Sequence, residues 1–425
     1  MSTDIRDRLR KLGVHKGAAH VTSKPKGALR AGLEALMEGE VIETDYGPIF
    51  VHTERYTPDH AHGRYALGAA LSQSPSIAAQ LAGRPSPGRR EGTQAREGEG
   101  LQLRRAAFID TETTGLAGGT GTLAFLIGVG TFAADDTFSV RQYFLRSPAE
   151  EPAALLHLAD WLDQFDAVVS FNGRGFDLPL LQTRFTLQRL RPRILSAPHL
   201  DLLTPARRVW RNRLESCRLS SLEGHILDVH RDQADVPGFL IPQLYFDYLR
   251  TGNAGEMPRV LYHNAYDILS MVTLSTHLIQ LFDQAQIANR NAGDLYALGK
   301  WHADQDQIEQ AETYLRQAMA SAEDVETRHA AALRLAAIYK QIDRRSEALP
   351  LWEAATDRAT TLAVEACSEL AKHYEWHDRQ LKRAMKWTQQ GLKLAAKLPS
   401  SPARAEAEAA LEHRLERLGQ KLKGK

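Results

Sequence analysis

Between residues 104 and 282 the chain alternates short apolar segments with longer segments of helical periodicity, and this alternation limits the possible folds more than any other feature. Four apolar segments are predicted to be strands: RRAAFID (104–110), TLAFLIGVGTF (122–132), FSVRQYF (138–144) and AVVSFNG (167–173). Three segments are predicted to be helices: EPAALLHLADWLDQF (151–165), LPLLQTRFTLQRL (178–190) and RVLYHNAYDILSMVTLSTHLIQLF (259–282). This order of strands and helices predicts an α/β domain with a mixed central sheet flanked by helices.

Shifts in composition divide the whole chain into five regions. The segment 83–100 is rich in Gly, Pro, Arg and Glu, so it cannot bury enough apolar surface to offset the entropy of ordering, and we expect a flexible linker. The predicted regions are an N-terminal, partly strand-forming region (1–82, with strand-like alternation at 40–56), the linker (83–100), the α/β domain (101–285), a helical region (286–400) and a charged C-terminal helix that caps it (401–425).

The helical region contains three related segments, 298–319, 335–356 and 370–392. Each has a leading Leu, an aromatic residue soon after it, a polar turn, and then an Ala. The alanines Ala311, Ala348 and Ala384 are 37 and 36 residues apart, close to the roughly 34-residue period of tetratricopeptide repeats. We therefore expect an all-α stack of tetratricopeptide-like hairpins, with a plain helical bundle as the alternative. The concave face of such a stack often binds partners.

Charge and cysteine content limit where and how such a chain can act. The formal net charge is +1, so binding of nucleic acid would require a local basic patch. The two cysteines, Cys217 and Cys367, form no disulfide framework and fit a reducing compartment. The charged start, MSTDIRDRLRKLG, lacks the apolar core of a signal peptide, and the apolar run 122–134 is too short to span a membrane. The prediction is a cytoplasmic protein.

The stretch FIDTETTGL (108–116) ends an apolar run with two acids, Asp110 and Glu112. Residues i and i+2 of a strand point to the same face, so these carboxylates project together and repel each other. A divalent cation between them would remove the repulsion, and oxygen ligands suit Mg²⁺ or Mn²⁺. The alternative is an exposed strand end with two solvated acids.

Two further acids follow in positions where a charge is unusual. Asp177 comes after a predicted strand and the turn N-G-R-G, where glycine allows a close approach of the backbone to a ligand. It could equally be a helix N-cap. Asp267 lies inside an otherwise apolar helix, where an unpaired charge is costly, and His263 lies one turn before it on the same face. This pair could also be structural.

Taken together, the motifs D-x-E, N-x₄-D and H-x₃-D occur in the order that is typical of the DEDD exonuclease superfamily with the ribonuclease H-like fold, which this chain resembles. Asp110, Glu112, Asp177 and Asp267 match its four carboxylates. The segments 219–252 and 262–271 look like the bacterial ribonuclease H-like family of the YprB type, and 40–64 looks like the N-terminal part of that family.

The resemblance implies a metal-dependent nuclease, expected to be a 3′–5′ exonuclease on DNA or RNA that uses two divalent ions, Mg²⁺ or Mn²⁺. It implies that Asp110 bridges the ions, that Glu112 and Asp267 hold the one on the nucleophile side, and that Asp177 holds the other. The nucleic-acid end is expected to contact the residues after the first motif and the Asn of the second, with Leu116 wedged against a base: Thr113, Thr114, Gly115, Leu116 and Asn172.

The identity of the proton acceptor stays open between two residues. The superfamily has a histidine subgroup, with the histidine five positions before the last aspartate, and a tyrosine subgroup, with the tyrosine four positions before it. Here His263 stands at the tyrosine spacing and Tyr262 at the histidine spacing. His263 is favoured, because the ordinary pKa of histidine suits a general base and because i,i+4 shares a face with Asp267.

Weaker signals leave further alternatives. The segment RRVWRNRLESCR (207–218) could contact phosphates through Arg207, Arg208 and Arg211, or it could be a solvated helix face. The histidines in VHTERYTPDHAHG (51–63) are expected to lie in a turn or hairpin rather than to bind a metal. A haloacid-dehalogenase reading of DTETT does not explain His263 and Asp267. An adaptor with an inactive nuclease domain that binds protein partners through its repeats is the remaining alternative.

Overall fold

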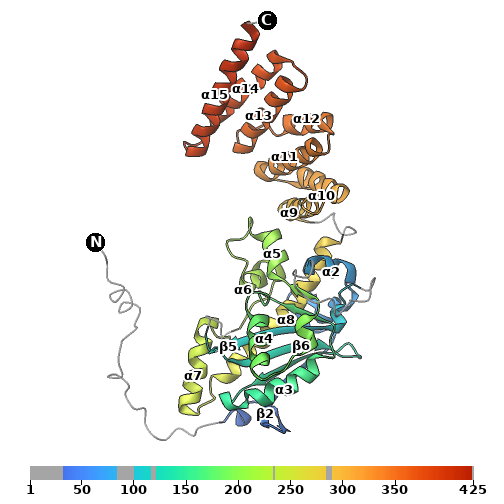
Figure 1. Cartoon of the computed structure of the whole chain (residues 1–425), viewed down its shortest axis with the longest axis vertical. Helices are drawn as coiled ribbons and strands as arrows, with labels where there is room; N and C mark the ends of the chain where they lie inside the picture. The colour runs from blue at the N-terminus through green and yellow to red at the C-terminus, as the bar shows by residue number, and fades with distance from the viewer. Residues whose placement is uncertain (1–31, 84–99, 116–120, 233–234, 284–289, 424–425) are drawn as a thin grey trace, which may run out of the picture.

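The computed structural model describes residues 32–83, 100–115, 121–232, 235–283 and 290–423. Figure 1 shows two parts along the long axis of the molecule: an α/β body and, stacked on one end of it, a column of helices that ends at the C-terminus. The predicted linker lies almost entirely outside the described residues, as does Leu116.

Within the described residues, seven strands form one sheet in the order β1-β2-β7-β6-β5-β8-β9. β8 and β9 run parallel to β5, and every other neighbouring pair is antiparallel. The predicted mixed sheet with flanking helices is therefore confirmed. The strands are β1 (Glu40–Thr44), β2 (Gly47–Tyr56), β5 (Ala106–Thr113), β6 (Ala124–Phe132), β7 (Phe138–Phe144), β8 (Ala167–Ser170) and β9 (His199–Asp201).

The strands of the sheet alternate their side chains between two apolar layers. Ala107 and Ile109 of β5 belong to one buried cluster, with residues of α3, α4 and α7. Phe108 belongs to a second cluster, with residues of α8. Helices therefore cover both faces of the sheet (Figure 1). Their bounds are α3 (Glu151–Leu162), α4 (Asp177–Leu187), α7 (Ile241–Thr251) and α8 (Met257–Phe282).

The helix α8 lies unusually close to the sheet because β6 has glycines beneath it. A Cβ atom on Gly128 would come within 2.0 Å of Asn264 Oδ1, and one on Gly130 within 2.5 Å of Ile268 Cγ2. Real Cβ atoms do not make such contacts, so both positions require glycine. This close approach brings the α8 residues near position 264 next to β5, which pairs with β6.

The described N-terminal residues pack on the same body. The strand-like segment 40–56 forms β1 and β2, which extend the sheet beyond β7. A small hairpin of β3 (Ala61–His62) and β4 (Tyr65–Ala66) lies against α8: His62 Nε2 is 2.8 Å from Ser270 Oγ, and Tyr65 Oη is 2.8 Å from His277 Nδ1. The expected turn or hairpin is thus present around His60 and His62, whereas His52 lies inside β2, opposite Gln142 of β7.

The C-terminal column consists of consecutive helical hairpins followed by one long helix, which confirms a helical region. Their assignment to the tetratricopeptide type, and the division into five regions, stay predictions. The helices are α9 (Ala292–Ala303), α10 (Ile308–Ser321), α11 (Val325–Gln341), α12 (Arg345–Ala354), α13 (Thr361–Trp376), α14 (Leu381–Ala395) and α15 (Pro402–Lys423).

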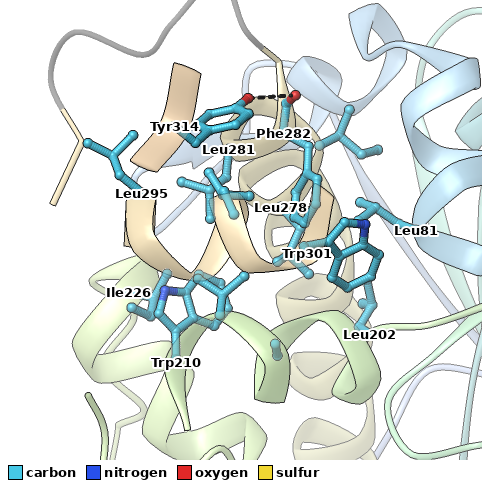
Figure 2. Close-up of a cluster of buried hydrophobic side chains, with 14 of the residues drawn as sticks. Leu81, Leu202, Trp210, Ile226, Leu278, Leu281, Phe282, Leu295, Trp301 and Tyr314 are labelled. Carbon is cyan, nitrogen blue, oxygen red and sulfur yellow. Dashed lines mark hydrogen bonds between the residues drawn. The ribbon is translucent and has the colours of Figure 1, made fainter. Parts of the chain in front are cut away.

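One apolar cluster runs without interruption from the α/β body into the column. Figure 2 shows Trp210, from α5 (Leu203–Trp210), and Phe282, from the end of α8, beside Leu295 and Trp301 of α9. Leu81, from α2 (Pro75–Ala82), joins them, and the hydroxyl of Tyr314 donates to the Phe282 carbonyl at 3.4 Å. The column is therefore anchored by a shared core.

A search of the described helices found no stretch with the length and apolar character needed to cross a membrane.

Candidate active site

The first two acids lie at the carboxyl end of the central strand β5. Asp110 and Glu112 follow Phe108 in the alternation, so they face α8, whereas Thr111 faces the layer of α3 and α4. The pairing of β5 with β6 shifts register between Glu112 and Thr113, where the regular strand ends. The strand therefore presents one carboxylate pair to α8 and a hydroxyl to α4.

Asp110 is held in place by a buried chain of amides. Asn264 Nδ2 donates to Asp110 Oδ2 at 2.8 Å, and Gln142 Nε2 donates to Asn264 Oδ1 at 2.8 Å. Gln142 also donates to the Leu261 carbonyl at 2.8 Å. Buried amides of this kind are hydrogen-bonded as a rule, and this chain ties β7, α8 and β5 together. The direction of the Asp110 carboxylate is thus fixed from two elements.

Asp177 is the first residue of α4 and lies below the same strand end. The hydroxyl of Thr111 donates to Asp177 Oδ1. Asp177 is buried, with 5% of its surface exposed. The preceding turn is held by Asp201 of β9, which accepts from the Asn172 and Arg174 amides at 2.8 and 3.0 Å. The alternative prediction, that Asp177 is the N-cap of the helix, is wrong, because the N-cap position is Phe176.

Asp267 and His263 lie one turn apart on α8 and face the first acids. His263 Nε2 is 4.0 Å from Glu112 Oε1 and 3.9 Å from Asp267 Oδ2. The other ring nitrogen, Nδ1, lies 2.7 Å from Asp235 Oδ1 and 3.2 Å from Arg231 Nη1, and it donates to Asp235 in the tautomer that carries the proton on Nδ1. Asp267 Oδ1 accepts from the guanidinium of Arg231.

The electrostatics of the site reflect a surplus of buried negative charge. Burial, followed by the charges of Asp267 and Asp177, raises the pKa of Asp110 well above its usual value. Burial, followed by the charges of Asp110, Asp267 and Asp177, does the same to the pKa of Glu112. Burial also raises the pKa of Asp177 to about 6, against the opposing hydrogen bond from Thr111. The four carboxylates are therefore close enough to repel one another.

The chemical character of these side chains fits a divalent cation, but their arrangement in the structure does not enclose one. Among the described residues, no group of three or more His, Cys, Asp or Glu side chains is arranged so that it could hold a metal ion. One oxygen of Asp267 is already bonded to Arg231. The donor set nevertheless fits Mg²⁺ or Mn²⁺, because it consists of carboxylate oxygens whose mutual repulsion a cation would relieve.

Thr113, Thr114 and Gly115, three of the predicted substrate-binding residues, lie at the end of β5 and directly after it. Thr113 Oγ1 donates to the Gly115 carbonyl at 3.0 Å, and Thr114 Oγ1 accepts from the Leu123 amide at 3.0 Å. Asn172 is exposed, in a left-handed conformation with φ of 66°. Their contact with a substrate stays a prediction, as does that of Leu116.

Tyr262, the alternative proton acceptor, packs in a different direction from His263. Its ring lies against Tyr266, with ring centroids 5.0 Å apart. His263 is the residue whose ring nitrogen lies about 4 Å from two of the four carboxylates.

The weaker arginine candidates lie away from the carboxylates, on α5 and in the turn after it. Arg207, Arg208 and Arg211 are exposed, and the Arg208 guanidinium lies over the ring of Trp301, 4.5 Å from its centroid. Arg208 and Arg211 line a cleft of about 1010 Å³ between α5 and the helices α9 and α11. The lining is mixed in charge, since it also includes Asp304, Glu323, Asp324 and Glu326.

Several residues of the site escaped the sequence analysis. Asn264 adjoins His263 in the quoted motif, but its bond to Asp110 spans 154 positions. Gln142 is the single amide in the predicted strand 138–144, which was a usable signal of a buried polar contact. The ion-paired residues Arg231, Glu223 and Asp235 lie in the segment 219–252, which resembles the YprB-type family, but no local pattern in that segment distinguished these three residues.

The comparisons with known proteins agree with this fold. A sequence model of the RNase H superfamily matches residues 107–279. The chain is 33% identical over 304 residues to the uncharacterized protein YprB of Bacillus subtilis (strain 168). The aligned residues make up 70% of this chain and 71% of YprB. The chain therefore belongs to the RNase H superfamily, and within it to the family that includes YprB.

A solved structure, the family B DNA polymerase of the archaeon Pyrobaculum calidifontis, is similar to 57% of this chain with 15% identity and a TM-score of 0.34. The match spans 30% of the polymerase chain. This similarity is too low to bear on function.

Proposed function

We propose that this protein is a metal-dependent nuclease of the DEDD type that removes nucleotides from the 3′ end of DNA or RNA. The observation that supports this proposal is the gathering of Asp110, Glu112, Asp177 and Asp267 around the end of β5, where burial, followed by the charges of neighbouring acids of this set, raises the pKa of Asp110 and of Glu112. Ionisable groups with strongly shifted pKa values tend to lie at functional sites. Membership of the RNase H superfamily, whose nucleases usually use divalent metals, supports the same reading.

The cofactors would be two divalent ions, Mg²⁺ or Mn²⁺. Asp110 would bridge them, Glu112 and Asp267 would hold one and Asp177 the other. Such ions lower the pKa of water and stabilise the attacking and leaving oxygens of a phosphodiester. The protein supplies the fixed carboxylates, and Asn264 keeps the Asp110 carboxylate directed into the site.

His263 would accept the proton from the attacking water. In the tautomer whose Nδ1 donates to Asp235, the free ring nitrogen is Nε2, which lies about 4 Å from Glu112 and Asp267. A general base has to reach the proton it removes, either directly or through one water. Tyr262, which packs on Tyr266, is the less favoured alternative.

The partner would be a nucleic-acid end, with the terminal nucleotide beside Thr113, Thr114, Gly115, Leu116 and Asn172. Arg207, Arg208 and Arg211 are candidates for phosphates further along the strand. We expect the protein to act in the cytoplasm, where Cys217 and Cys367, both free thiols, would stay reduced.

The second candidate function is an adaptor that binds proteins through a tetratricopeptide-like column. The cleft between α5 and the helices α9 and α11 supports it, because a lining with both charges suits a peptide. The two candidate functions differ in what they require: the nuclease needs its four carboxylates, whereas the adaptor does not.

The test is degradation of single-stranded DNA and RNA labelled at either end, with Mn²⁺, read by product length. The wild type is expected to release mononucleotides from the 3′ end. The Asp110→Asn variant, which keeps the size of the side chain and an acceptor oxygen for Asn264, is expected to release none. Equal product from both proteins would reject the proposal in favour of the adaptor, and internal fragments alone would reject the exonuclease direction.

A further inference from the structure

We infer that Arg231, paired with Glu223, is a positioning residue that holds the fourth carboxylate, Asp267, ready for a metal ion. This inference rests on the proposed function. Arg231 lies outside the four-carboxylate motif and is not among the site residues predicted from the sequence.

The Arg231–Glu223 pair has a fixed geometry. Arg231 Nε donates to Glu223 Oε2 at 2.8 Å, and Nη2 donates to Glu223 Oε1 at 2.6 Å. The two parallel bonds form a fork, which sets the plane of the guanidinium. The side chains are 13% and 2% exposed, so water competes little with these bonds. The same Nη2 also donates to Asp267 Oδ1, and the orientation of Asp267 therefore follows from that of the pair.

The charge of the pair explains why Arg231 can contact Asp267 without replacing a metal ion. Glu223 balances the positive charge of Arg231, so the pair as a whole adds little net charge to the site. Arginine stays protonated in proteins, and Arg231 donates hydrogen bonds to both Glu223 and Asp267. Asp267 thus receives a rigid hydrogen-bond donor and keeps most of its negative charge for a cation.

The contact leaves the reactive side of the site open. Arg231 engages Oδ1 of Asp267, whereas Oδ2 lies 3.9 Å from His263 Nε2, on the side of Glu112. Arg231 Nη1 lies 3.2 Å from His263 Nδ1 and 3.5 Å from Asp235 Oδ2, and Asp235 Oδ1 lies 2.7 Å from the same Nδ1. One guanidinium therefore sets both the fourth carboxylate and the partner of the histidine.

The pair is itself supported from the N-terminal hairpin. Glu223 opens a π-helical turn, Glu223–Leu227, a geometry that is frequent at functional sites. Ser270 Oγ donates to Glu223 Oε1 at 2.6 Å, and His62 of β3 lies 2.8 Å from Ser270 Oγ. Burial lowers the pKa of His62 to about 4, so this histidine is a neutral donor in the chain. The hairpin thus has a role as a support of the site.

The experiment measures binding of Mn²⁺ by calorimetry to the full chain and to variants, without substrate. Groups that orient metal ligands typically contribute 10–100-fold to affinity. Arg231→Met is expected to weaken Mn²⁺ binding by about that factor, and to raise by the same factor the Mn²⁺ concentration that gives half-maximal activity. Unchanged affinity would overturn the inference, and tighter binding would show instead that Arg231 competes with the metal.

Two further variants control for folding. Arg231→Met leaves Glu223 buried without its partner, so the double variant Glu223→Gln with Arg231→Gln, which buries no charge, is measured beside it and is expected to bind Mn²⁺ equally weakly. Arg184→Met removes a matched arginine, 12% exposed and paired with Glu151, which is 7% exposed, on α4 and α3. It is expected to lower the melting temperature but not the Mn²⁺ affinity, and an equal loss of affinity there would overturn the inference.

The wild type separates this inference from the proposed function. If the wild type itself binds no Mn²⁺, the proposed nuclease function fails and the inference fails with it. If the wild type binds Mn²⁺ and Asp110→Asn does not, while the Arg231 variants bind like the wild type, the inference fails alone.

Discussion

At the residue scale, the four acids of the site differ in what holds them. Asp110 accepts from the amide of Asn264, and Asp177 accepts from the hydroxyl of Thr111. Such neutral donors set the direction of a carboxylate but do not balance its charge. Asp267 alone accepts from a guanidinium, and Glu223 already balances that charge. The site therefore holds more negative charge than its described surroundings neutralise.

The stability of the metal-free protein should reveal this surplus through Asp177. Burial raises its pKa to about 6, above the ordinary value of 3.8. A carboxyl whose pKa is raised on folding favours the folded state fully below the ordinary value, and this contribution is lost as the pH rises through about 6. At pH 7.5 the ionised group therefore opposes folding, by an amount on the order of 2–3 kcal/mol.

Asp177→Asn should remove this penalty, since the amide keeps an acceptor for Thr111 but carries no charge. We expect the variant to be more stable than the wild type at pH 7.5 without metal, by up to about 2–3 kcal/mol, and the gain to shrink towards pH 4. Denaturant unfolding at both values measures it. A gain that does not depend on pH would show that the charge of Asp177 is not the cause.

At the scale of elements, the site depends on how closely α8 approaches the sheet. Gly128 is the cross-strand partner of Asp110, and it lies directly beneath Asn264. A side chain at Gly128 would lift α8 from the strand and separate the Asn264 amide from the Asp110 carboxylate. The position of Asp267, one turn further along α8, would change with it.

Gly128→Ala is therefore expected to disturb both folding and activity. The added Cβ atom would meet Asn264 Oδ1 at 2.0 Å, and overpacking of this kind costs about 1–3 kcal/mol. We expect a lower melting temperature and a fall in nuclease activity of at least about tenfold, because a displacement near 1 Å can cost more than this. Gly419→Ala on α15, where a Cβ atom meets open space, is the control: it should leave the activity unchanged and should not lower the melting temperature, because alanine favours a helix more than glycine does. Full activity in Gly128→Ala would contradict the account of α8.

At the scale of the whole molecule, the sequence allowed the fold to be predicted better than the contacts within the site. The strands 124–132 and 138–144 are long and apolar enough for periodicity to identify them, whereas β9 has only three residues and was missed. The alternation in 40–56 predicts a strand but carries no information on which sheet edge it joins. The shared core of Trp210 and Trp301 joins two regions that the composition separates.

The predicted acids could be found because strand and helix geometry are local. Asp110 and Glu112 share a face through the i,i+2 rule, and His263 and Asp267 through the i,i+4 rule. The bonds from Asn264 to Asp110 and from Arg231 to Asp267 depend on how distant segments pack, which no local rule describes.

We propose above all that the four carboxylates from β5, α4 and α8 bind divalent cations together. Anomalous diffraction at the manganese edge, from crystals grown with Mn²⁺ and a mononucleotide, tests it most directly. The account predicts manganese density in contact with Asp110, with Glu112 or Asp267 on one side and Asp177 on the other. Crystals that bind the nucleotide at this site but show no manganese beside Asp110 would contradict it.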